Sequence, residues 1–449
     1  MSDTLDLLVI GAGACGLAAA IAAHDAGLST AIVEKLDRPG GNAALSTGSV
    51  PAAGSRFQRN AGIDDSPARM IRDLAAIAPE TDDPALLARM AETSAPTVEW
   101  LIDTVGARLA LVTAYKHIGH SVPRLHAPRS RRGQDLVDDL LAAAHSRAIP
   151  LAPGNAVASL AHDQGAVTGA RLDSGEIIPA RKTLLATNGF AANPAMVARY
   201  CPEIAGAPYF GARGSTGDAI AWGLELGAAL ANMAAYQGYA AVAYPHGTLL
   251  SWTTIEKGGF LVGTEARRFG DESLGYSGYA RIVLAQGPEA IALFDQRIFD
   301  IAAAEDEFLE LSRYGGIKPA ASIGQAATAN RLDPAALADE LRLYNAAAAG
   351  APDRFGRRDF GLAPLAPPFY ACRVTPGLFH TQGGLRIDAD ARVLRTDGTP
   401  IPNLFAGGGA AAGISGRAGA LGYASGNGLL TAIALGRLAA LAAAQELAS

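Results

Sequence analysis

A glycine-rich turn near the start of the chain constrains the fold more than any other feature. Residues 5–10 (LDLLVI) form a short apolar run, which predicts a buried parallel strand, and residues 17–27 predict an Ala-rich helix. Between them, residues 11–16 (GAGACG) match the pattern G-x-G-x-x-G, and residues 29–34 predict a second strand. A strand–helix–strand start of this kind favours a right-handed crossover and a doubly wound parallel sheet.

The three glycines of this turn serve different purposes in binding a dinucleotide. Gly11 makes the turn, Gly13 lets the backbone approach a pyrophosphate, and Gly16 lets helix and strand pack closely. The N-terminus of the helix offers free N–H groups and a positive dipole end to the phosphates. Glu34 ends the second strand, where a carboxylate accepts hydrogen bonds from a ribose diol. The pattern therefore predicts a dinucleotide site.

Two further glycine-rich segments favour FAD over NAD. Residues 40–42 (GGN) follow Glu34 closely, and residues 43–48 continue as a loop of small residues that can lie against a flat ring or a pyrophosphate. Near the C-terminus, residues 407–409 (GGG) follow a predicted strand, and residues 426–428 (GNG) open the last helix. A helix N-terminus at the electron-rich edge of a flavin stabilises the reduced, anionic ring.

Composition excludes several classes of function. The net charge of -6 gives no basic surface for nucleic acid and no polybasic patch for an anionic membrane. The Ala-rich stretch at 429–447 predicts a packed helix rather than a membrane span, and Met1–Thr4 lacks the positive charge of a signal peptide. Cys15, Cys201 and Cys372 form no CxxC pair. We therefore expect free thiols and a cytoplasmic protein.

Changes in sequence texture predict a large domain interrupted by a smaller one. The expected α/β architecture is a doubly wound, Rossmann-like FAD-binding domain over residues 1–234 and 363–449, interrupted by an inserted α+β cap domain over residues 235–362. Residues 151–178 alternate like β-hairpins. The ranges predicted to be helical include 67–105, 133–148, 217–231 and 332–349, the last opened by Asp333–Pro334.

Seven segments together carry a family resemblance. They are DLLVIGAGACGLAAAIAA, VEKLDRPGGNAALSTG, LLATNGF, STGDAIAWGLELGA, HTQGGLRID, FAGGG and SGNGLLTAIALGR. With them the sequence resembles the fumarate reductase / succinate dehydrogenase flavoprotein superfamily, which also holds the 3-ketosteroid dehydrogenases. The resemblance implies an FAD domain, a cap domain that closes over the flavin, and hydride exchange with flavin N5. Members with covalent flavin carry a His in the loop that here reads NAALS (residues 42–46), so we expect noncovalent FAD.

The expected FAD contacts come from the glycine motifs and from this resemblance. The resemblance implies contacts from Glu34, Lys35, Gly41, Asn42, Gly48, Val157, Asp218, Ser425 and Leu429. The other residues expected to bind FAD are Gly11, Gly13, Ala14, Gly16, Gly40, Ser46, Thr47, Thr187, Asn188, Gly189, Gly408 and Asn427.

Two tyrosines stand where the fumarate reductase pattern has arginines. Fumarate reductases use an Arg as proton donor shortly after an Arg-Phe pair in the cap; the pair here is Arg268–Phe269, and Tyr276 stands at the donor position. Tyr423 stands where an Arg clamps a substrate carboxylate. The tyrosines resemble the ketosteroid dehydrogenase branch. A tyrosinate can take a proton alpha to a carbonyl, and a second phenol can hydrogen-bond the carbonyl oxygen.

His380 and Arg417 complete the expected catalytic set. His380 matches the fumarate reductase pattern, and Arg417 lies close in sequence to the last glycine turn. We expect dehydrogenation or reduction of a C–C bond adjacent to a carbonyl or carboxylate, with a diffusible electron donor or acceptor. For each of these side chains a purely structural role is the alternative. Dicarboxylate reduction, aspartate-oxidase-like amine oxidation and a flavin-binding redox sensor without turnover are alternative functions.

A histidine-rich segment at residues 117–126 (HIGHSVPRLH) predicts no metal site, because no acidic ligand lies close to its three histidines. We expect it to be a loop that borders the flavin pocket. Arg124 and His126 within it either contact substrate or have structural roles.

Overall fold

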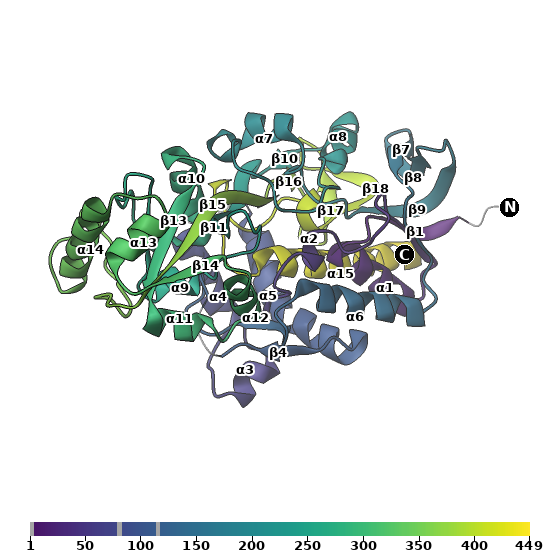
Figure 1. Cartoon of the computed structure of the whole chain (residues 1–449). Coiled ribbons are helices and arrows are strands. Elements are labelled where there is room, and N and C mark those ends of the chain that lie inside the picture. The colour runs from purple at the N-terminus through teal and green to yellow at the C-terminus, as the bar shows by residue number, and fades with distance from the viewer. Residues whose placement is uncertain (1–3, 79–82, 114–116) are drawn as a thin grey trace. The chain divides into compact units, whose positions relative to one another are not determined.

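The computed structural model describes residues 4–78, 83–113 and 117–449 and divides the chain into two compact units (Figure 1). Unit 1 comprises Met1–Cys201, Gly211–Tyr236 and His380–Ser449. Unit 2 comprises Pro202–Phe210 and Gln237–Phe379. Unit 2 therefore extends beyond the range 235–362 expected for the inserted segment, because strand β15 (Phe369–Thr381) pairs with β13 (Ala290–Asp295) and β14 (Ile317–Ala320).

A doubly wound sheet forms the centre of unit 1, as the first strand–helix–strand segment predicts. Its strand order is β17-β18-β9-β1-β2-β6. Strand β1 is parallel to both β2 and β9, β18 is parallel to β9, and β17 adds an antiparallel edge. The strands are β1 (Leu5–Ile10), β2 (Thr30–Val33), β6 (Leu151–Ala152), β9 (Ile177–Leu185), β17 (Arg392–Leu394) and β18 (Pro400–Ala406), and the hairpin β7 (Val157–Asp163) and β8 (Ala166–Leu172) continues from β9.

The helices α1 (Ala14–Asp25) and α15 (Asn427–Ala448) pack against each other (Figure 1). Small residues permit this approach, because a Cβ atom on Gly436 would lie 2.2 Å from the carbonyl oxygen of Cys15. Within the described part of the chain, α15 is the one helix long and apolar enough to cross a membrane, but 72% of its most apolar window is buried inside the structure. This burial is typical of a core helix.

The other elements of unit 1 confirm one helical expectation and correct another. The range 67–105 is helical in α4 (Pro67–Ile77), α5 (Pro84–Trp100) and a π-helical turn (Leu101–Val105), and residues 79–82 of that range lie outside the described residues. The range 217–231 ends early, because Gly227 adopts a φ of 78° and the chain enters a short strand. The remaining elements are α2 (Gly41–Ala44), α3 (Arg56–Asn60), α6 (Gly133–Ser146), α7 (Pro194–Tyr200), α8 (Asp218–Glu225), β3 (Val50–Pro51), β4 (Leu109–Leu111), β5 (Leu125–Pro128), β10 (Leu230–Ala231), β16 (Gly384–Leu385) and β19 (Ala418–Gly419).

Unit 2 has the α+β character expected of the inserted segment. Its sheet has the order β12 (Phe260–Val262), β13, β15 and β11 (Ala234–Ala243), with β14 paired to β15 and the short β19 paired to the start of β11. Asp333 caps α14 (Pro334–Ala348) by accepting hydrogen bonds from the N–H groups of Ala335 and Ala336, as the Asp-Pro start signal predicts. The other elements are α9 (Thr253–Glu256), α10 (Gly275–Gln286), α11 (Gln296–Ala302), α12 (Asp306–Arg313) and α13 (Ile323–Ala329).

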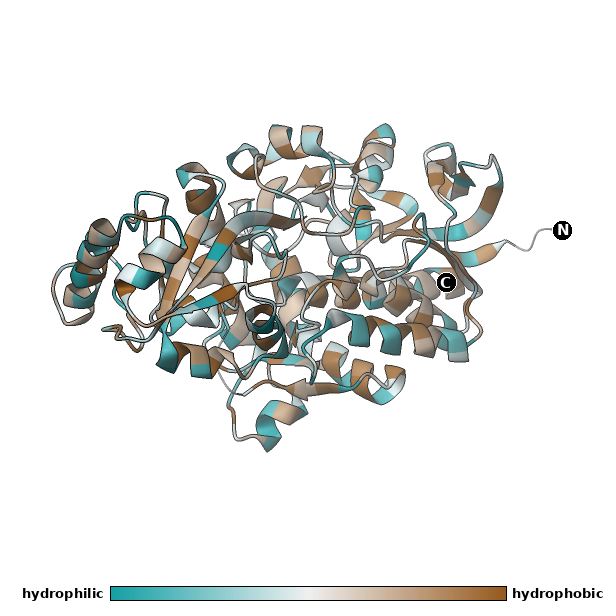
Figure 2. Cartoon of the chain, in the orientation of Figure 1, coloured by the Kyte–Doolittle hydropathy of each residue, from teal (hydrophilic) through white to brown (hydrophobic). Residues whose placement is uncertain are grey.

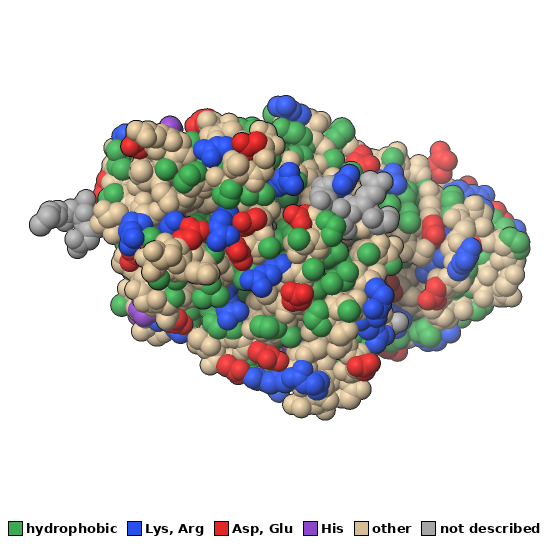
Figure 3. Space-filling model, turned by 180° about the vertical axis from the view of Figure 1, so that it is seen from behind, with side chains coloured by type: hydrophobic (Ala, Val, Ile, Leu, Met, Phe, Trp, Pro, Cys, Tyr) green, Lys and Arg blue, Asp and Glu red, His purple; other side chains and the backbone are tan. Residues whose placement is uncertain are grey.

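Side-chain polarity follows this architecture. In Figure 2 the helices α6 and α14 carry both hydrophilic and hydrophobic residues along their length, because each exposes one face and buries the other. On the face shown in Figure 3, positive and negative side chains are interspersed. Exposed ion pairs of the chain include Arg56 with Asp103.

Candidate active site

The first glycine turn has the geometry of a phosphate site. Gly11 adopts a φ of 110°, and a Cβ there would lie 2.4 Å from the carbonyl oxygen of Ala186. A Cβ on Gly16 would lie 1.9 Å from the carbonyl oxygen of Gly11, so both positions require glycine. At Gly13 a Cβ would meet only the carbonyl oxygen of Gly40, at 3.9 Å, so the protein does not crowd the backbone at the N-terminus of α1. A pyrophosphate can approach the first N–H groups of the helix there.

Glu34 lies beside this turn at the end of β2. Its Oε2 accepts a hydrogen bond from the N–H of Ala12 at 2.7 Å, and its Oε1 accepts one from the N–H of Leu36 at 2.9 Å. A carboxylate has about four lone-pair positions, so two remain for a ribose diol. These backbone contacts fix the carboxylate next to the glycine turn.

Lys35 and Asp218, two residues that the resemblance assigns to FAD, contact each other directly. The Nζ of Lys35 donates to Asp218 Oδ2 at 2.7 Å and to Thr216 Oγ1 at 2.6 Å. This ion pair joins the end of β2 to the first turn of α8. Both side chains keep about a quarter of their surface exposed, at 27% and 28%.

The loop after β2 lies against the first glycine turn. Gly40 donates its N–H to the carbonyl of Ala12 at 2.9 Å and forms an isolated parallel bridge with Gly13. Asn42 accepts a hydrogen bond from the N–H of Ala212 at 2.6 Å. The loop closes with internal hydrogen bonds of small side chains: Ser46 Oγ accepts from the N–H of Gly48, and the hydroxyls of Thr47 and Ser49 pair at 2.9 Å.

The carboxyl ends of β1, β9 and β18 bring a second glycine cluster to the same edge of the sheet. Gly407 donates its N–H to the carbonyl of Leu185, and a Cβ on Gly409 would lie 2.5 Å from Asn188 Oδ1. The hydroxyl of Thr187 is buried and has no hydrogen-bond partner among the described residues. Ligands of open α/β sheets bind at the carboxyl ends of the strands, so this orphaned hydroxyl fits a bound cofactor.

The start of α15 holds a second orphaned polar group. Asn427 is 1% exposed, and both polar atoms of its amide lack a hydrogen-bond partner among the described residues. A Cβ on Gly426 would lie 2.8 Å from the carbonyl oxygen of Ser49, so this turn packs against the end of the loop after β2. Buried amides are almost always hydrogen-bonded, and a polar ring edge would satisfy this one. The residues present fit FAD.

Two of the expected catalytic residues meet at this helix start. The rings of His380 and Tyr423 make an edge contact, with centroids 5.8 Å apart, and Tyr423 is 7% exposed. A Cβ on Gly428 would lie 3.2 Å from the imidazole of His380. Burial lowers the pKa of His380 to about 4, so the ring is neutral at neutral pH. Arg417, by contrast, is exposed and directly precedes β19.

Tyr276 is the second residue of α10 in unit 2. Its ring lies 5.0 Å from that of Tyr239, whose hydroxyl donates to the carbonyl of Leu250 at 2.9 Å. The segment before Tyr276 is fixed by buried ion pairs, since Arg268 contacts Glu272 at 2.7 Å. The backbone that carries Tyr276 is therefore held in place by contacts within its own unit.

Within the histidine-rich segment, the contacts of Arg124 favour a structural role. Arg124 is fully buried and donates to Asp65 and to Asp73, each at 2.7 Å. His126 pairs with Ser55 Oγ at 3.1 Å. Of the two open roles, substrate contact and structure, these contacts favour structure. Sequence reasoning missed the two aspartates because nothing local marks them as partners of Arg124. Within residues 4–78, 83–113 and 117–449, no cluster of three or more His, Cys, Asp or Glu side chains could hold a metal ion.

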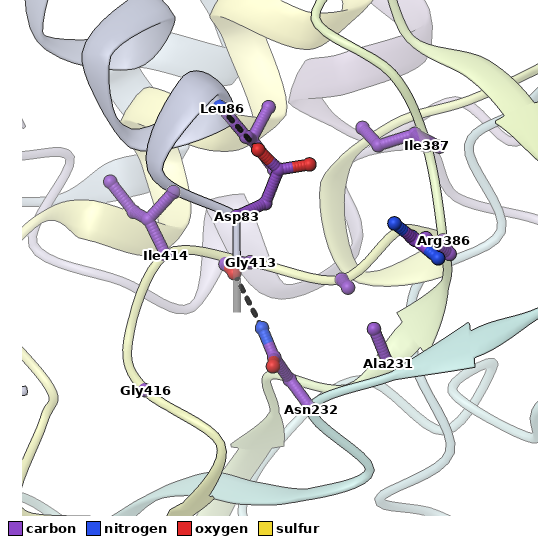
Figure 4. Close-up of a pocket in the computed structure, with 10 residues that line it drawn as sticks. Asp83, Leu86, Ala231, Asn232, Arg386, Ile387, Gly413, Ile414 and Gly416 are labelled. Carbon is purple, nitrogen blue, oxygen red and sulfur yellow. Dashed lines mark hydrogen bonds between the residues drawn. The ribbon is translucent and has the colours of Figure 1, made fainter. Parts of the chain in front are cut away.

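A small pocket in unit 1 is lined by none of the expected site residues, although its lining residue Gly416 directly precedes Arg417 (Figure 4). Asn232 donates from Nδ2 to the carbonyl of Gly413 at 2.8 Å at its edge, and Arg386 lines it. None of its ten lining residues is an expected FAD contact. The remaining lining residues are Asp83, Leu86, Ala231, Ile387, Ala412, Ile414 and Gly416.

Comparison with known proteins agrees with this geometry. A family model described as "FAD binding domain" matches residues 6–429. The chain is 34% identical to the NADH:fumarate oxidoreductase of Klebsiella pneumoniae (strain 342), covering 92% of this chain but 45% of that protein. It is 32% identical to a fumarate reductase (cytochrome) of Shewanella frigidimarina, covering 99% of this chain and 77% of that protein. The chain thus spans less than half of the first relative.

Solved structures give the same result. The open conformation of a flavocytochrome c3 fumarate reductase has a TM-score of 0.84 and 29% identity, covering 100% of this chain and 79% of that one. The 3-ketosteroid-delta4-(5alpha)-dehydrogenase of Rhodococcus jostii RHA1 has a TM-score of 0.77 and 26% identity, covering 99% and 98%. This chain therefore belongs to the FAD-binding flavoprotein family that includes the fumarate reductases, and it is an FAD-dependent oxidoreductase.

Proposed function

We propose that this chain moves two hydrogens across a C–C bond adjacent to a carbonyl or carboxylate of a small molecule. Bound FAD supplies the hydride acceptor or donor at N5. Both kinds of relative support the proposal, since their names describe fumarate reduction and 3-ketosteroid dehydrogenation. A diffusible carrier would exchange electrons with the flavin. Cys15, Cys201 and Cys372 are buried and form no disulfide within the described part of the chain, which supports a reducing compartment, and we propose the cytoplasm.

The observation that carries the proposal is the ring contact between half-buried His380 and buried Tyr423 at the start of α15. The phenol of Tyr423 can donate a hydrogen bond to a carbonyl oxygen on which negative charge develops. The neutral imidazole of His380 can donate a second hydrogen bond to a substrate oxygen. Tyr423 is buried, and shielding from water strengthens such hydrogen bonds. Arg417 is the proposed partner for a substrate carboxylate.

Tyr276 is the proposed proton carrier. Its place after Arg268–Phe269 matches that of the acid in fumarate reductases, and a phenol can carry a proton to or from carbon as an Arg does. Tyr239 packs against its ring, and the pair Arg268–Glu272 fixes the chain before it. A catalytic acid or base benefits from such rigid support.

The proposed FAD site is noncovalent. Gly11, Gly13 and Gly16 would hold the pyrophosphate, Glu34 the ribose, and Asn427 the ring edge. Because the loop at 42–46 carries no His, acid precipitation should release all yellow colour into the supernatant. Colour retained in the protein pellet would contradict this assignment.

Dicarboxylate reduction is the second candidate, because the most similar relatives reported above are fumarate reductases and His380 matches their pattern. Tyrosine at 276 and 423 counts against it, since a dicarboxylate needs cationic partners and a phenol offers none. A ketone needs only hydrogen-bond donors at its oxygen. Carbonyl substrates are therefore the first choice.

An anaerobic screen tests the proposal. Oxidised holoenzyme is mixed with saturated cyclic ketones, 3-ketosteroids and succinate, and chemically reduced holoenzyme with the matching unsaturated compounds. We expect bleaching or recovery of the flavin absorbance with one of the ketone pairs. Exchange with fumarate and succinate alone would select the second candidate. No exchange with any compound, from a flavin that dithionite reduces normally, would contradict both.

A further inference from the structure

The turn that carries Tyr423 is hydrogen-bonded to a loop that lies far from it in the sequence. We call residues 118–120 the support loop and residues 423–427 the active-site turn. The Nε2 of His120 lies 2.8 Å from the carbonyl oxygen of Ser425, and the N–H of Ser425 donates to the carbonyl of Ile118 at 3.0 Å. The N–H and the C=O of Ser425 are thus both held by hydrogen bonds to the support loop.

Steric contact adds to these hydrogen bonds. Gly119, with a φ of 83°, lies so close to the active-site turn that a Cβ on it would be 2.4 Å from the Cβ of Ala424. Only glycine fits at that distance with that φ. The support loop therefore meets the active-site turn at three consecutive residues.

The hydrogen bonds around His120 determine its tautomer. An Nη of Arg124 lies 3.2 Å from Nδ1 of His120, and a guanidinium can only donate. Nδ1 must therefore accept, so the ring proton is on Nε2 and is donated to the carbonyl of Ser425. Asp65 and Asp73 orient Arg124 in turn, each at 2.7 Å. This chain of contacts ends at the active-site turn.

His120 is 8% exposed, and the charged groups that face it are Arg124, Asp73 and Asp65. Burial lowers the pKa of His120 to about 4, the neighbouring arginine acts in the same direction, and the bond to Ser425 and the two aspartates act against it. The ring is therefore a neutral hydrogen-bond bridge at neutral pH, and a role as acid or base does not fit it.

We propose that His120 is a positioning residue for the reaction. Its Nε2–H fixes the Ser425 carbonyl, and through it the place of Tyr423 and of Asn427 at the start of α15. This inference rests on the proposed function for the part played by Tyr423, but its effect on the flavin rests only on FAD binding.

Two substitutions test the roles of the two ring nitrogens one at a time. In His120→Gln the side-chain amide can reach the Nε2 position and keep the donor to Ser425. In His120→Asn the amide reaches only the Nδ1 position, so the contact with Arg124 can remain while the donor to Ser425 is lost. His162→Asn, on the exposed β7 strand, is the matched control. All are purified as holoenzymes, and their FAD content and melting temperature are recorded.

We expect His120→Asn to lower the limiting rate of substrate-driven flavin reduction by about 10- to 100-fold, since small misplacements of a catalytic group have effects of this size. The His120→Gln enzyme should keep most of the rate, and His162→Asn all of it. The flavin midpoint potential should shift in His120→Asn alone, because Asn427 moves relative to the ring.

The proposal would be overturned if His120→Asn and His120→Gln had the same rate of flavin reduction and the same midpoint potential, whether both matched the wild type or both departed from it. If no substrate reduces the wild-type flavin, the proposed function fails, and the midpoint potentials alone decide on His120. If His120→Asn does not fold, ¹⁵N-histidine NMR of the wild-type holoenzyme decides, with the signal assigned by its loss in His120→Gln. The Nε2–H tautomer at neutral pH is expected, and an Nδ1–H tautomer or an imidazolium would overturn the assignment.

Discussion

Replacement of Glu34 by Ala should weaken FAD binding by a predictable amount. The carboxylate is oriented by two backbone N–H groups, at 2.7 and 2.9 Å, and keeps two lone-pair positions for a ribose diol. Hydrogen bonds to a charged group contribute about 1.5–3 kcal/mol each, so two of them contribute about 3–6 kcal/mol. At about 1.4 kcal/mol per factor of ten, the Kd for FAD should rise by about 10²- to 10⁴-fold.

The assay is an FAD titration of the apoprotein, followed by the rate of flavin reduction at saturating FAD. We expect Glu34→Ala to be isolated largely without FAD and to recover most of the wild-type rate when FAD is added. Glu34→Gln is the matched variant, because it keeps the shape and one carbonyl oxygen and should bind with intermediate affinity. A Glu34→Ala protein that is isolated fully loaded would refute the ribose assignment. A rate that stays low at full loading would show that Glu34 serves the chemistry instead.

Three further predictions concern the proton carrier, the glycine turn and pH. Tyr276→Phe should reduce substrate-driven flavin reduction by about 10²- to 10⁴-fold in stopped-flow traces, with unchanged FAD content, and a wild-type rate would exclude Tyr276. Gly16→Ala should yield protein that neither folds stably nor retains FAD, since its Cβ would lie 1.9 Å from a carbonyl oxygen, and normal yield and colour would contradict the turn geometry. His126 and His380 each have a pKa lowered to about 4 by burial, against an ordinary value of 6.5, so the unfolded chain binds these protons first as the pH falls. The melting temperature should therefore drop as the pH falls from 6.5 to about 4, and a constant value would contradict the burial of these rings.

The sequence predicts the parts of the fold that depend on local patterns. The strand at residues 5–10, the glycine turn after it and the acidic end of the next strand all lie where expected, because each depends on neighbours within a few residues. The Asp-Pro start of α14 is predicted for the same reason. The boundary of unit 2 is not, because β15 belongs to a sheet whose other strands lie far earlier in the chain.

Long-range contacts set the limit for the candidate site as well. The pair of His380 and Tyr423 could be proposed residue by residue from a family pattern, but their ring contact depends on how the chain folds back at α15. The bond between His120 and Ser425 joins residues 305 positions apart, and no periodicity or spacing signals it. The sequence leaves two roles open for Arg124, and only the fold shows its buried ion pair with Asp65.

The central claim is tested most directly by a deuterium isotope effect on anaerobic flavin reduction. A ketone that bleaches the flavin is prepared with deuterium on the carbon beta to the carbonyl, and its rate is compared with the unlabelled compound in wild-type and Tyr423→Phe enzymes. We predict a clear primary isotope effect in wild type and slower reduction in the variant, because the hydride leaves that carbon while Tyr423 binds the oxygen. Bleaching at the same rate with both isotopes and with both enzymes would contradict the account.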